Sequence, residues 1–406
     1  MSDILNTDYF CILPWIHMHV WPNGDTYPCC LANSDYKLGN TDKSSFQEIW
    51  NSDRMKTLRS NILEQKPTAG CSKCYEHQKN GARSMRQNMN DDFKHLYNRI
   101  QDTLPDGSVE NIHMAYMDIR FSNICNMKCR TCGPNHSSFW VDDAIKIGRY
   151  DTNSPKILKI KNDTGDLWQE IIKWIDTVEK IYFAGGEPLI MEEHYRILNY
   201  LIDTGKTDIS ISYNTNMSKM EYKSTSVIDL WKNFKHINVG ASLDAMGERA
   251  EYMRKGTNWS EIENNVKVLK RELPNIEFNI SSTISAYNVL HCVDFFQDWI
   301  DKEYIKPTDI DLNILLHPSY QQVKILPLEM RSQAIDKIHK FLDHNQLQHI
   351  DRSGRTFNMF NALITALGDY IPHQAHDFIR HNSIVDEIRN ERLFDTFPEL
   401  KGLLQQ

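Results

Sequence analysis

The sequence has 406 residues, of which 40% are hydrophobic, and its 46 Lys and Arg against 54 Asp and Glu give a formal net charge of −8. This composition is typical of a globular protein with two or three domains. It excludes an integral membrane protein, because no apolar run approaches the roughly 18 residues of a membrane span, and the acidic balance argues against broad binding to a nucleic acid backbone.

The first 100 residues have the pattern of a small α+β domain. A turn at residues 22–25, with the sequence Pro-Asn-Gly-Asp, separates two short strand candidates. An amphipathic helix follows. Its apolar stripe consists of Phe46, Ile49, Trp50, Met55, Leu58 and Ile62. We therefore expect residues 1–100 to fold as a separate small domain.

From residue 113 to 325, short apolar strands alternate with helical stretches. Strands separated by helices predict a parallel α/β sheet or a partly closed barrel. One of the helices is expected to begin with a capping box from Ser260 to Glu263. Residues 326–406 have helical spacing, which predicts a helical C-terminal extension. The strand candidates are residues 117–121, 180–184, 208–213, 237–243, 276–284 and 309–316.

Nine cysteines are the most informative part of the composition, and eight of them fall in the first 132 residues. The first ten residues contain Asp3 and Asp8 but no Lys or Arg. Such a segment does not resemble a signal peptide, so we expect a cytoplasmic protein. In that compartment, crowded thiols indicate metal or cluster ligation rather than disulfide bonds.

Cys125, Cys129 and Cys132 form a C-x3-C-x2-C loop directly after the first strand candidate of the α/β region. The carboxyl ends of barrel strands are where active sites of α/β barrels lie. Three thiolates cannot complete a tetrahedral zinc site or ligate all four irons of a cubane cluster. One position therefore stays open for a non-protein ligand, which is a catalytic arrangement. The alternative is a zinc site completed by His136 or by a distant residue.

This loop, followed at the end of the next strand by Gly185-Gly186-Glu187-Pro188, resembles the radical S-adenosylmethionine (SAM) superfamily. The resemblance implies a partial (β/α)6 TIM-like barrel. It also implies that the three cysteines hold a catalytic 4Fe-4S cluster, whose fourth iron is chelated by the amino and carboxylate groups of SAM. The Gly-Gly-Glu-Pro segment would receive the methionine amino group, with Glu187 as a hydrogen-bond acceptor.

Polar residues at later strand ends extend the resemblance. Asn214 lies at the end of the third strand, Ser242 and Asp244 lie at the end of the fourth, and Arg254 follows shortly afterwards. By resemblance, these residues contact the ribose or the methionine carboxylate of SAM. Turn and capping chemistry is the alternative. Thr131 departs from the family, which commonly has an aromatic residue there near the adenine.

The N-terminal cysteines form a second set, which consists of Cys11, Cys29 (or Cys30), Cys71 and Cys74. Four thiolates permit zinc or a fully ligated iron-sulfur cluster, and the spacing alone favours zinc. The residues around them, FCILPWIHMHVWPNGDTYPCC, FQEIWNS and CSKC, resemble SPASM and twitch auxiliary-cluster domains over about residues 9–80. This resemblance implies a second, auxiliary 4Fe-4S cluster. The domain ordinarily follows the barrel and here precedes it, and Cys29 fits the Gly-x4-Cys step better than Cys30.

The combined resemblance implies an oxidoreductase or transformase that cleaves SAM reductively to a 5'-deoxyadenosyl radical. The radical would abstract hydrogen from a peptide or protein side chain, leading to oxidation, cross-linking or epimerisation, while the auxiliary cluster relays electrons. A reductase, flavodoxin or ferredoxin would supply the electron, and neither a nucleic acid nor a membrane partner is expected. Alternatives are a small-molecule substrate such as an aminoglycoside or nucleoside, and a non-catalytic zinc-binding protein.

Three remaining residues have weaker patterns. Cys292 shares a helical stripe with apolar residues, so it is either a buried core thiol or a hydrogen-atom donor to a substrate radical. His17 and His19 alternate with apolar residues on a predicted strand. We expect these two histidines to line one face of a hairpin and assign them no metal role.

Overall fold

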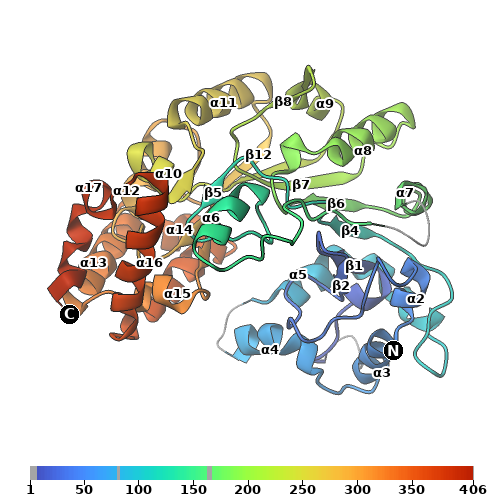
Figure 1. Cartoon of the computed structure of the whole chain (residues 1–406). Helices are drawn as coiled ribbons and strands as arrows, with labels where there is room; N and C mark the ends of the chain where they lie inside the picture. The colour runs from blue at the N-terminus through green and yellow to red at the C-terminus, as the bar shows by residue number, and fades with distance from the viewer. Residues whose placement is uncertain (1–6, 80–82, 162–166, 406) are drawn as a thin grey trace. The chain divides into compact units, whose positions relative to one another are not determined.

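The computed structural model describes residues 7–79, 83–161 and 167–405. It has an α/β fold with a mostly parallel sheet, a small N-terminal α+β region and a helical C-terminal region (Figure 1), as the sequence predicts. The chain divides into two compact units. The first comprises Met1–Asn123, Ile157–Gly185 and Lys206–Ser212, and the second comprises Ile124–Lys156, Gly186–Gly205 and Tyr213–Gln406.

The strands of the first unit follow the hydrogen-bonded order β6-β4-β1-β2-β3. Strand β1 (His17–Val20) pairs in parallel with β4 (Tyr116–Ile119), and β4 pairs in parallel with β6 (Lys180–Phe183). Strands β2 (Asp25–Tyr27) and β3 (Gly39–Asn40) continue antiparallel. Because β1 joins β4, the unit crosses the expected boundary near residue 100, and the three-region division of the chain remains a prediction.

Local signals in the sequence explain the turn and helices of the first unit. Gly24, with φ of +79°, allows the expected tight turn between β1 and β2. Ser45 and Glu48 form a capping box on α2 (Phe46–Trp50), and Ser52 caps α3 (Asp53–Leu63). The single helix that the sequence predicts here is thus two helices, although its apolar stripe is buried as expected. The other helices are α4 (Ser72–Lys79), α5 (Met85–Asp92), α7 (Leu167–Ile175) and the 3-10 segments η1 (Leu13–Trp15), η2 (Ala69–Cys71) and η3 (Lys94–Asp102).

In the second unit, strands β10 (Ile237–Ala241), β12 (Glu277–Ile284) and β13 (Ile310–Ile314) are parallel, and their order continues as β13-β12-β10-β7. Strand β7 (Ser210–Thr215) has residues in both units. Alternate residues face the helices: the hydroxyl of Tyr213 on β7 accepts a hydrogen bond from Trp231 on α9 (Val227–Trp231). The remaining helices in this part are α8 (Glu192–Asp203), α10 (Gly247–Met253), α11 (Trp259–Glu272) and α12 (Cys292–Asp301).

One helix start differs from the prediction. Helix α11 begins at Trp259, and its N-cap is Asn258, whose side chain accepts a hydrogen bond from the Glu261 backbone N–H at 3.4 Å. The Ser260–Glu263 capping box is therefore wrong. Asn258 accepts from an orphan N–H of the first helical turn, so the helix is capped two residues earlier than expected.

The C-terminal region of the second unit is helical, as predicted. Figure 1 shows these helices in orange and red, and none of the described helices is long and apolar enough to cross a membrane. Helix α16 contacts α6 (Val141–Lys146), which follows the cysteine loop. The C-terminal helices are α13 (Leu328–His344), α14 (Leu347–Ile350), α15 (Arg355–Gly368), α16 (Gln374–Arg389) and α17 (Leu393–Thr396).

Candidate active site

The three-cysteine loop is held by a short strand pair. Strand β5 (Lys128–Cys129) pairs antiparallel with β11 (Arg254–Lys255), which places Arg254 opposite Cys129. The indole N–H of Trp140 donates to the Cys129 carbonyl at 2.7 Å, and the Cys132 N–H donates to the same oxygen at 3.0 Å. Two protein donors therefore hold the Cys129 carbonyl at the middle of the loop.

The loop thiols are partly buried and lie beside a cation. Burial raises the pKa of Cys125 and of Cys132, the latter to about 12. Burial also raises the pKa of Cys129, but the Arg254 guanidinium, whose Nη1 lies 3.6 Å from the Cys129 Sγ, acts in the opposite direction. Metal ligation requires thiolates, so the cation favours the ligating form.

Gly186 of the Gly-Gly-Glu-Pro turn touches the cysteine loop. The Glu187 N–H donates to the Ile124 carbonyl at 2.8 Å. Gly186 has φ of +53°, and a Cβ there would lie 2.2 Å from that same oxygen, so only glycine fits. In the first unit, a Cβ on Gly185 would meet the Arg120 side chain at 2.9 Å. Pro188 begins the 3-10 segment η5 (Pro188–Ile190).

The Glu187 carboxylate is engaged by protein donors. It accepts hydrogen bonds from the Thr215 hydroxyl at 2.7 Å and from the Asn216 N–H at 2.7 Å, and it caps the Leu189 N–H at 3.1 Å. The side chain is buried, and this burial raises its pKa to about 6. Glu187 thus joins its own turn to the end of β7, and its expected contact with the SAM amino group remains a prediction.

Asp244 and Arg254 form a buried ion pair beside Cys129. Arg254 Nε lies 2.8 Å from Asp244 Oδ2, while the other carboxylate oxygen of Asp244 accepts a hydrogen bond from the Thr283 N–H at 2.8 Å. Asn214, the residue before the last of β7, lies next to β10, because a Cβ on Gly240 would lie 2.7 Å from the Asn214 Oδ1. The Ser242 N–H donates to the Thr215 carbonyl at 2.7 Å. The predicted residues at these two strand ends therefore lie at one edge of the sheet.

Sequence reasoning missed a polar link to the cysteine loop. The Asn126 side chain accepts a hydrogen bond from Asn216 at 3.0 Å and donates one to the Ser218 hydroxyl at 2.8 Å. Asn126 stands between two ligand candidates. The sequence around Asn126 does not predict this link, because its partners lie about 90 residues downstream, after a strand.

The C-terminal helix α16 also binds the loop. Arg130, whose side chain is 1% exposed, donates to Asn382 at 2.8 Å and pairs with Asp386 and with Glu391. Its guanidinium carbon lies 3.6 Å from the centre of the Tyr252 ring. Arg130, which lies between the second and third cysteines, is therefore held by α16 and by Glu391 just after it.

The second cysteine set lies in the first unit around one cavity. This cavity is lined by Cys11, Cys29, Cys71 and Cys74. Cys30 does not line it, and its Sγ lies 3.7 Å from the Met85 Sδ. Among the residues described, no three His, Cys, Asp or Glu side chains are arranged to share one metal ion. The four ligands of a cubane cluster bind different irons, so they need not converge on one ion.

The same unit buries an unexpected polar group on strands β1 and β4. His19 Nδ1 donates to Asp118 at 2.9 Å, and Arg120 Nε donates to the same carboxylate at 2.7 Å. His17 Nδ1 donates to the Tyr116 carbonyl at 2.8 Å, and burial lowers its pKa to about 4. Parallel pairing places His17 opposite Tyr116 and His19 opposite Asp118. The two histidines are thus part of the sheet core and not only of a hairpin face.

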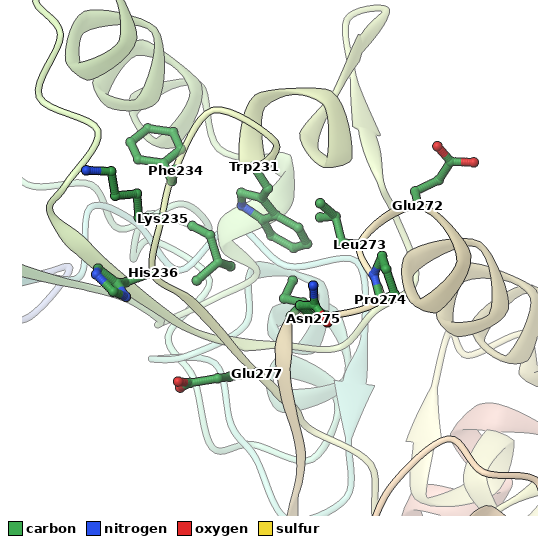
Figure 2. A pocket seen from close by; sticks show the side chains of 11 residues that line it. Trp231, Phe234, Lys235, His236, Glu272, Leu273, Pro274, Asn275 and Glu277 are labelled. Carbon is green, nitrogen blue, oxygen red and sulfur yellow. The ribbon is translucent and has the colours of Figure 1, made fainter.

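Cys292 and the cavity shown in Figure 2 both lie apart from the thiol loop in the described contacts. Cys292 is the first residue of α12, is fully buried, and its Sγ points to the Val289 carbonyl at 3.5 Å.

The cavity in Figure 2 has a volume of about 230 Å³ and is lined by Trp231, Leu273 and neighbours at the N-terminal ends of β10 and β12. The predicted site residues lie at the opposite, carboxyl ends of these strands, so this cavity is not the candidate active site.

Two protein-family models match this sequence. A sequence model of the radical SAM superfamily matches residues 119–285, and a model of the SPASM iron-sulfur cluster-binding domain matches residues 11–75. The fold is therefore of the radical SAM type. Residues 119–285 thus match the radical SAM superfamily of enzymes and residues 11–75 match its SPASM domain, which confirms the predicted family.

Solved structures are similar only at low identity. Native anSMEcpe with bound AdoMet and the Cp18Cys peptide is 19% identical over 56% of this chain and 60% of its own, with a TM-score of 0.39. SuiB of Streptococcus suis bound to its precursor peptide SuiA is 14% identical over 72% of this chain and 64% of its own, with a TM-score of 0.37. The chain thus spans less than two thirds of the length of either structure. No curated protein sequence matches it significantly.

Proposed function

We propose that this chain is a radical SAM enzyme that abstracts hydrogen from a peptide or protein side chain and uses an auxiliary iron-sulfur cluster as an electron relay. Cys125, Cys129 and Cys132 would hold the catalytic 4Fe-4S cluster. The single observation that carries the proposal is the arrangement of these thiols in a loop whose backbone is locked by β11 and by the Gly-Gly-Glu-Pro turn. When bound, the cluster and SAM supply one-electron cleavage of SAM to a 5'-deoxyadenosyl radical.

The residues present fit an iron-sulfur cluster. Three partly buried thiols would leave one iron open for SAM, and Arg254 Nη1 lies 3.6 Å from the Cys129 Sγ. The turn at Gly186 and the strand ends with Asn214, Ser242 and Asp244 carry the polar groups that would bind SAM, together with Gly185, Glu187, Pro188 and Arg254. The protein's part in the reaction is to orient these groups and exclude water.

The auxiliary cluster is assigned to Cys11, Cys29, Cys71 and Cys74, whose side chains line one cavity. Four thiolates leave no iron for substrate, so the role proposed for this cluster is to accept an electron from the substrate radical. A flavodoxin, ferredoxin or reductase would supply the electron that starts each turnover. The peptide or protein class of substrate rests on the family resemblance of the SPASM domain.

Anaerobic reconstitution tests the proposal. Two clusters predict about eight irons per chain, and the reduced protein should release 5'-deoxyadenosine from SAM. Cys129→Ala should lower the iron content to about four and abolish this release, whereas Cys292→Ala, a matched control, should keep both. Full SAM cleavage by Cys129→Ala would refute the assignment of the catalytic cluster.

A second measurement addresses the substrate. Peptides encoded beside the gene are incubated with the enzyme, SAM and a reductant, and mass spectrometry then detects a mass loss of two hydrogens, a cross-link or an inverted stereocentre. Modification of an aminoglycoside or nucleoside in parallel incubations, with no change in any peptide, would overturn the peptide assignment and leave the radical chemistry standing.

A further inference from the structure

Helix α16 ends at an arginine whose charge the described protein groups do not fully balance. The Arg389 side chain is 0% exposed, and its Nε lies 2.7 Å from Asp143 Oδ2. Its guanidinium carbon lies 4.8 Å from the centre of the Trp140 ring. The other two guanidinium nitrogens, Nη1 and Nη2, are buried and make no hydrogen bond among the described residues. Such unsatisfied donors are costly, so their presence needs an explanation.

The local charge count makes the imbalance clearer. Asp143 is shared, because Lys128 Nζ lies 2.8 Å from its other carboxylate oxygen. Burial opposes ionisation of Asp143, but the two cations lower its pKa below the usual range. One carboxylate therefore faces two cations. By contrast, Arg254 pairs with Asp244, and Arg130 pairs with both Asp386 and Glu391. The Lys128–Asp143–Arg389 group thus leaves one buried positive charge unmatched.

This group adjoins the thiol loop. The Arg389 guanidinium lies over the Trp140 ring. The indole N–H of Trp140 donates to the Cys129 carbonyl at 2.7 Å. Val385, one helical turn before Arg389, packs with Trp140 in a small apolar cluster that Cys132 joins.

We propose that Arg389 is an electrostatic positioning residue for the catalytic cluster: its unmatched charge stabilises the reduced cluster and raises the reduction potential. This inference rests on the proposed function, which places a 4Fe-4S cluster on Cys125, Cys129 and Cys132. Three thiolates on a 2+ core leave about one net negative charge, and one electron from an external donor adds a second. A fixed buried cation stabilises the doubly charged state more than the singly charged state.

The test is an anaerobic redox titration of the reconstituted holoenzyme. Electron paramagnetic resonance follows the cluster signal that shifts when SAM is added, because SAM binds only the open iron. Arg389→Met removes the charge and keeps the length of the side chain, and Arg389→Lys keeps the charge. Arg380→Met is the matched control, because Arg380 lies on the same helix, is exposed, and pairs with Asp377 at 3.0 Å. Iron content and melting temperature are measured for each variant.

Arg389→Met should lower the equilibrium constant for cluster reduction about tenfold or more, which is about 59 mV for one electron. Arg389→Lys and Arg380→Met should stay near the wild type. Asp143→Asn should act in the opposite direction and raise the potential, because it leaves two cations without their carboxylate. A merely structural role would not reverse the sign between these two variants.

Arg389→Met with full iron content and an unchanged potential would overturn the inference and leave the proposed function intact. If Arg389→Met fails to fold or to take up iron, Asp143→Asn decides, and an unchanged or lowered potential in it overturns the inference. Refutation of the proposed function is a separate result: the Cys129→Ala protein would keep all its iron and still cleave SAM.

Discussion

Gly186→Ala tests the contact between the Gly-Gly-Glu-Pro turn and the cysteine loop. Gly186 has φ of +53°, and a Cβ there would lie 2.2 Å from the Ile124 carbonyl oxygen, against about 3.4 Å for an ordinary contact. The turn and the loop would have to separate by about 1 Å, and the Glu187 N–H to Ile124 bond, now 2.8 Å long, would be lost. Gly205→Ala is the matched control, because Gly205 has φ of +69° and open space around it.

The two variants share one cost and differ in another. A left-handed conformation costs a residue with a Cβ roughly 1–2 kcal/mol. Gly186→Ala adds the loss of a buried hydrogen bond, roughly 1–3 kcal/mol. We therefore expect a loss of about 1–2 kcal/mol for Gly205→Ala and of about 2–5 kcal/mol for Gly186→Ala. Each kcal/mol corresponds to a fall of roughly 2–4 °C in melting temperature for a domain of roughly 150–250 residues.

Differential scanning fluorimetry, iron analysis and 5'-deoxyadenosine release measure the outcome. Gly205→Ala should keep about eight irons and full SAM cleavage. Gly186→Ala should melt several degrees lower than Gly205→Ala, lose SAM cleavage, and retain only the irons of the auxiliary cluster. Equal melting temperatures and equal iron contents for the two variants would show that the turn does not support the loop.

Three further outcomes follow from the thiols and from His17. Cys29→Ala should lower the iron content to about four while Cys30→Ala keeps about eight, because Cys29 alone of the two lines the cavity; the reverse result would make Cys30 the ligand. Cys292→Ala should cost about 1 kcal/mol of packing and keep product formation, and loss of product with normal SAM cleavage would identify a hydrogen donor. Burial lowers the His17 pKa from 6.5 to about 4, so the unfolded chain takes up the proton first as the pH falls, and stability present above pH 6.5 is lost towards pH 4. From pH 7.5 to 5.5, His17→Gln should remove about 1 kcal/mol of that loss in melting experiments, and an unchanged pH dependence would contradict this reasoning.

The parts of the fold that the sequence predicts well are those in which a short stretch determines its own environment. The strands found at Ile237–Ala241 and Glu277–Ile284 lie within the predicted residues 237–243 and 276–284, because their alternate apolar residues pack against helices. The cysteine loop is equally local, since three thiols within eight residues cannot be far apart. In both cases the information lies in neighbouring residues.

The parts that the sequence does not predict depend on partners far along the chain. Asp118 pairs with His19, which precedes it by 99 residues, and nothing in either segment specifies the other. Arg130 contacts Asn382 on helix α16, and Arg389 on the same helix contacts Asp143, which follows the cysteines. Each pair is separated by about 250 residues in the sequence. The alternation of apolar and polar residues predicts which face of a strand or helix such a residue occupies. It does not predict which other element packs against that face.

The pairing of β1 with β4 accounts for the unusual order of the SPASM domain and the α/β region. A parallel ladder requires that two strands share a direction, and it places no condition on which strand comes first in the chain. His17–Val20 meets Tyr116–Ile119 in this way, and the segment between them, which carries α2, α3, α4 and α5, is long enough for the crossover that parallel strands need. The hairpin of β1 and β2 carries Cys29 beyond its end. A cluster domain can therefore precede the sheet that it extends, because hydrogen bonding to β4 depends on the direction of the neighbouring strand and not on its position in the sequence.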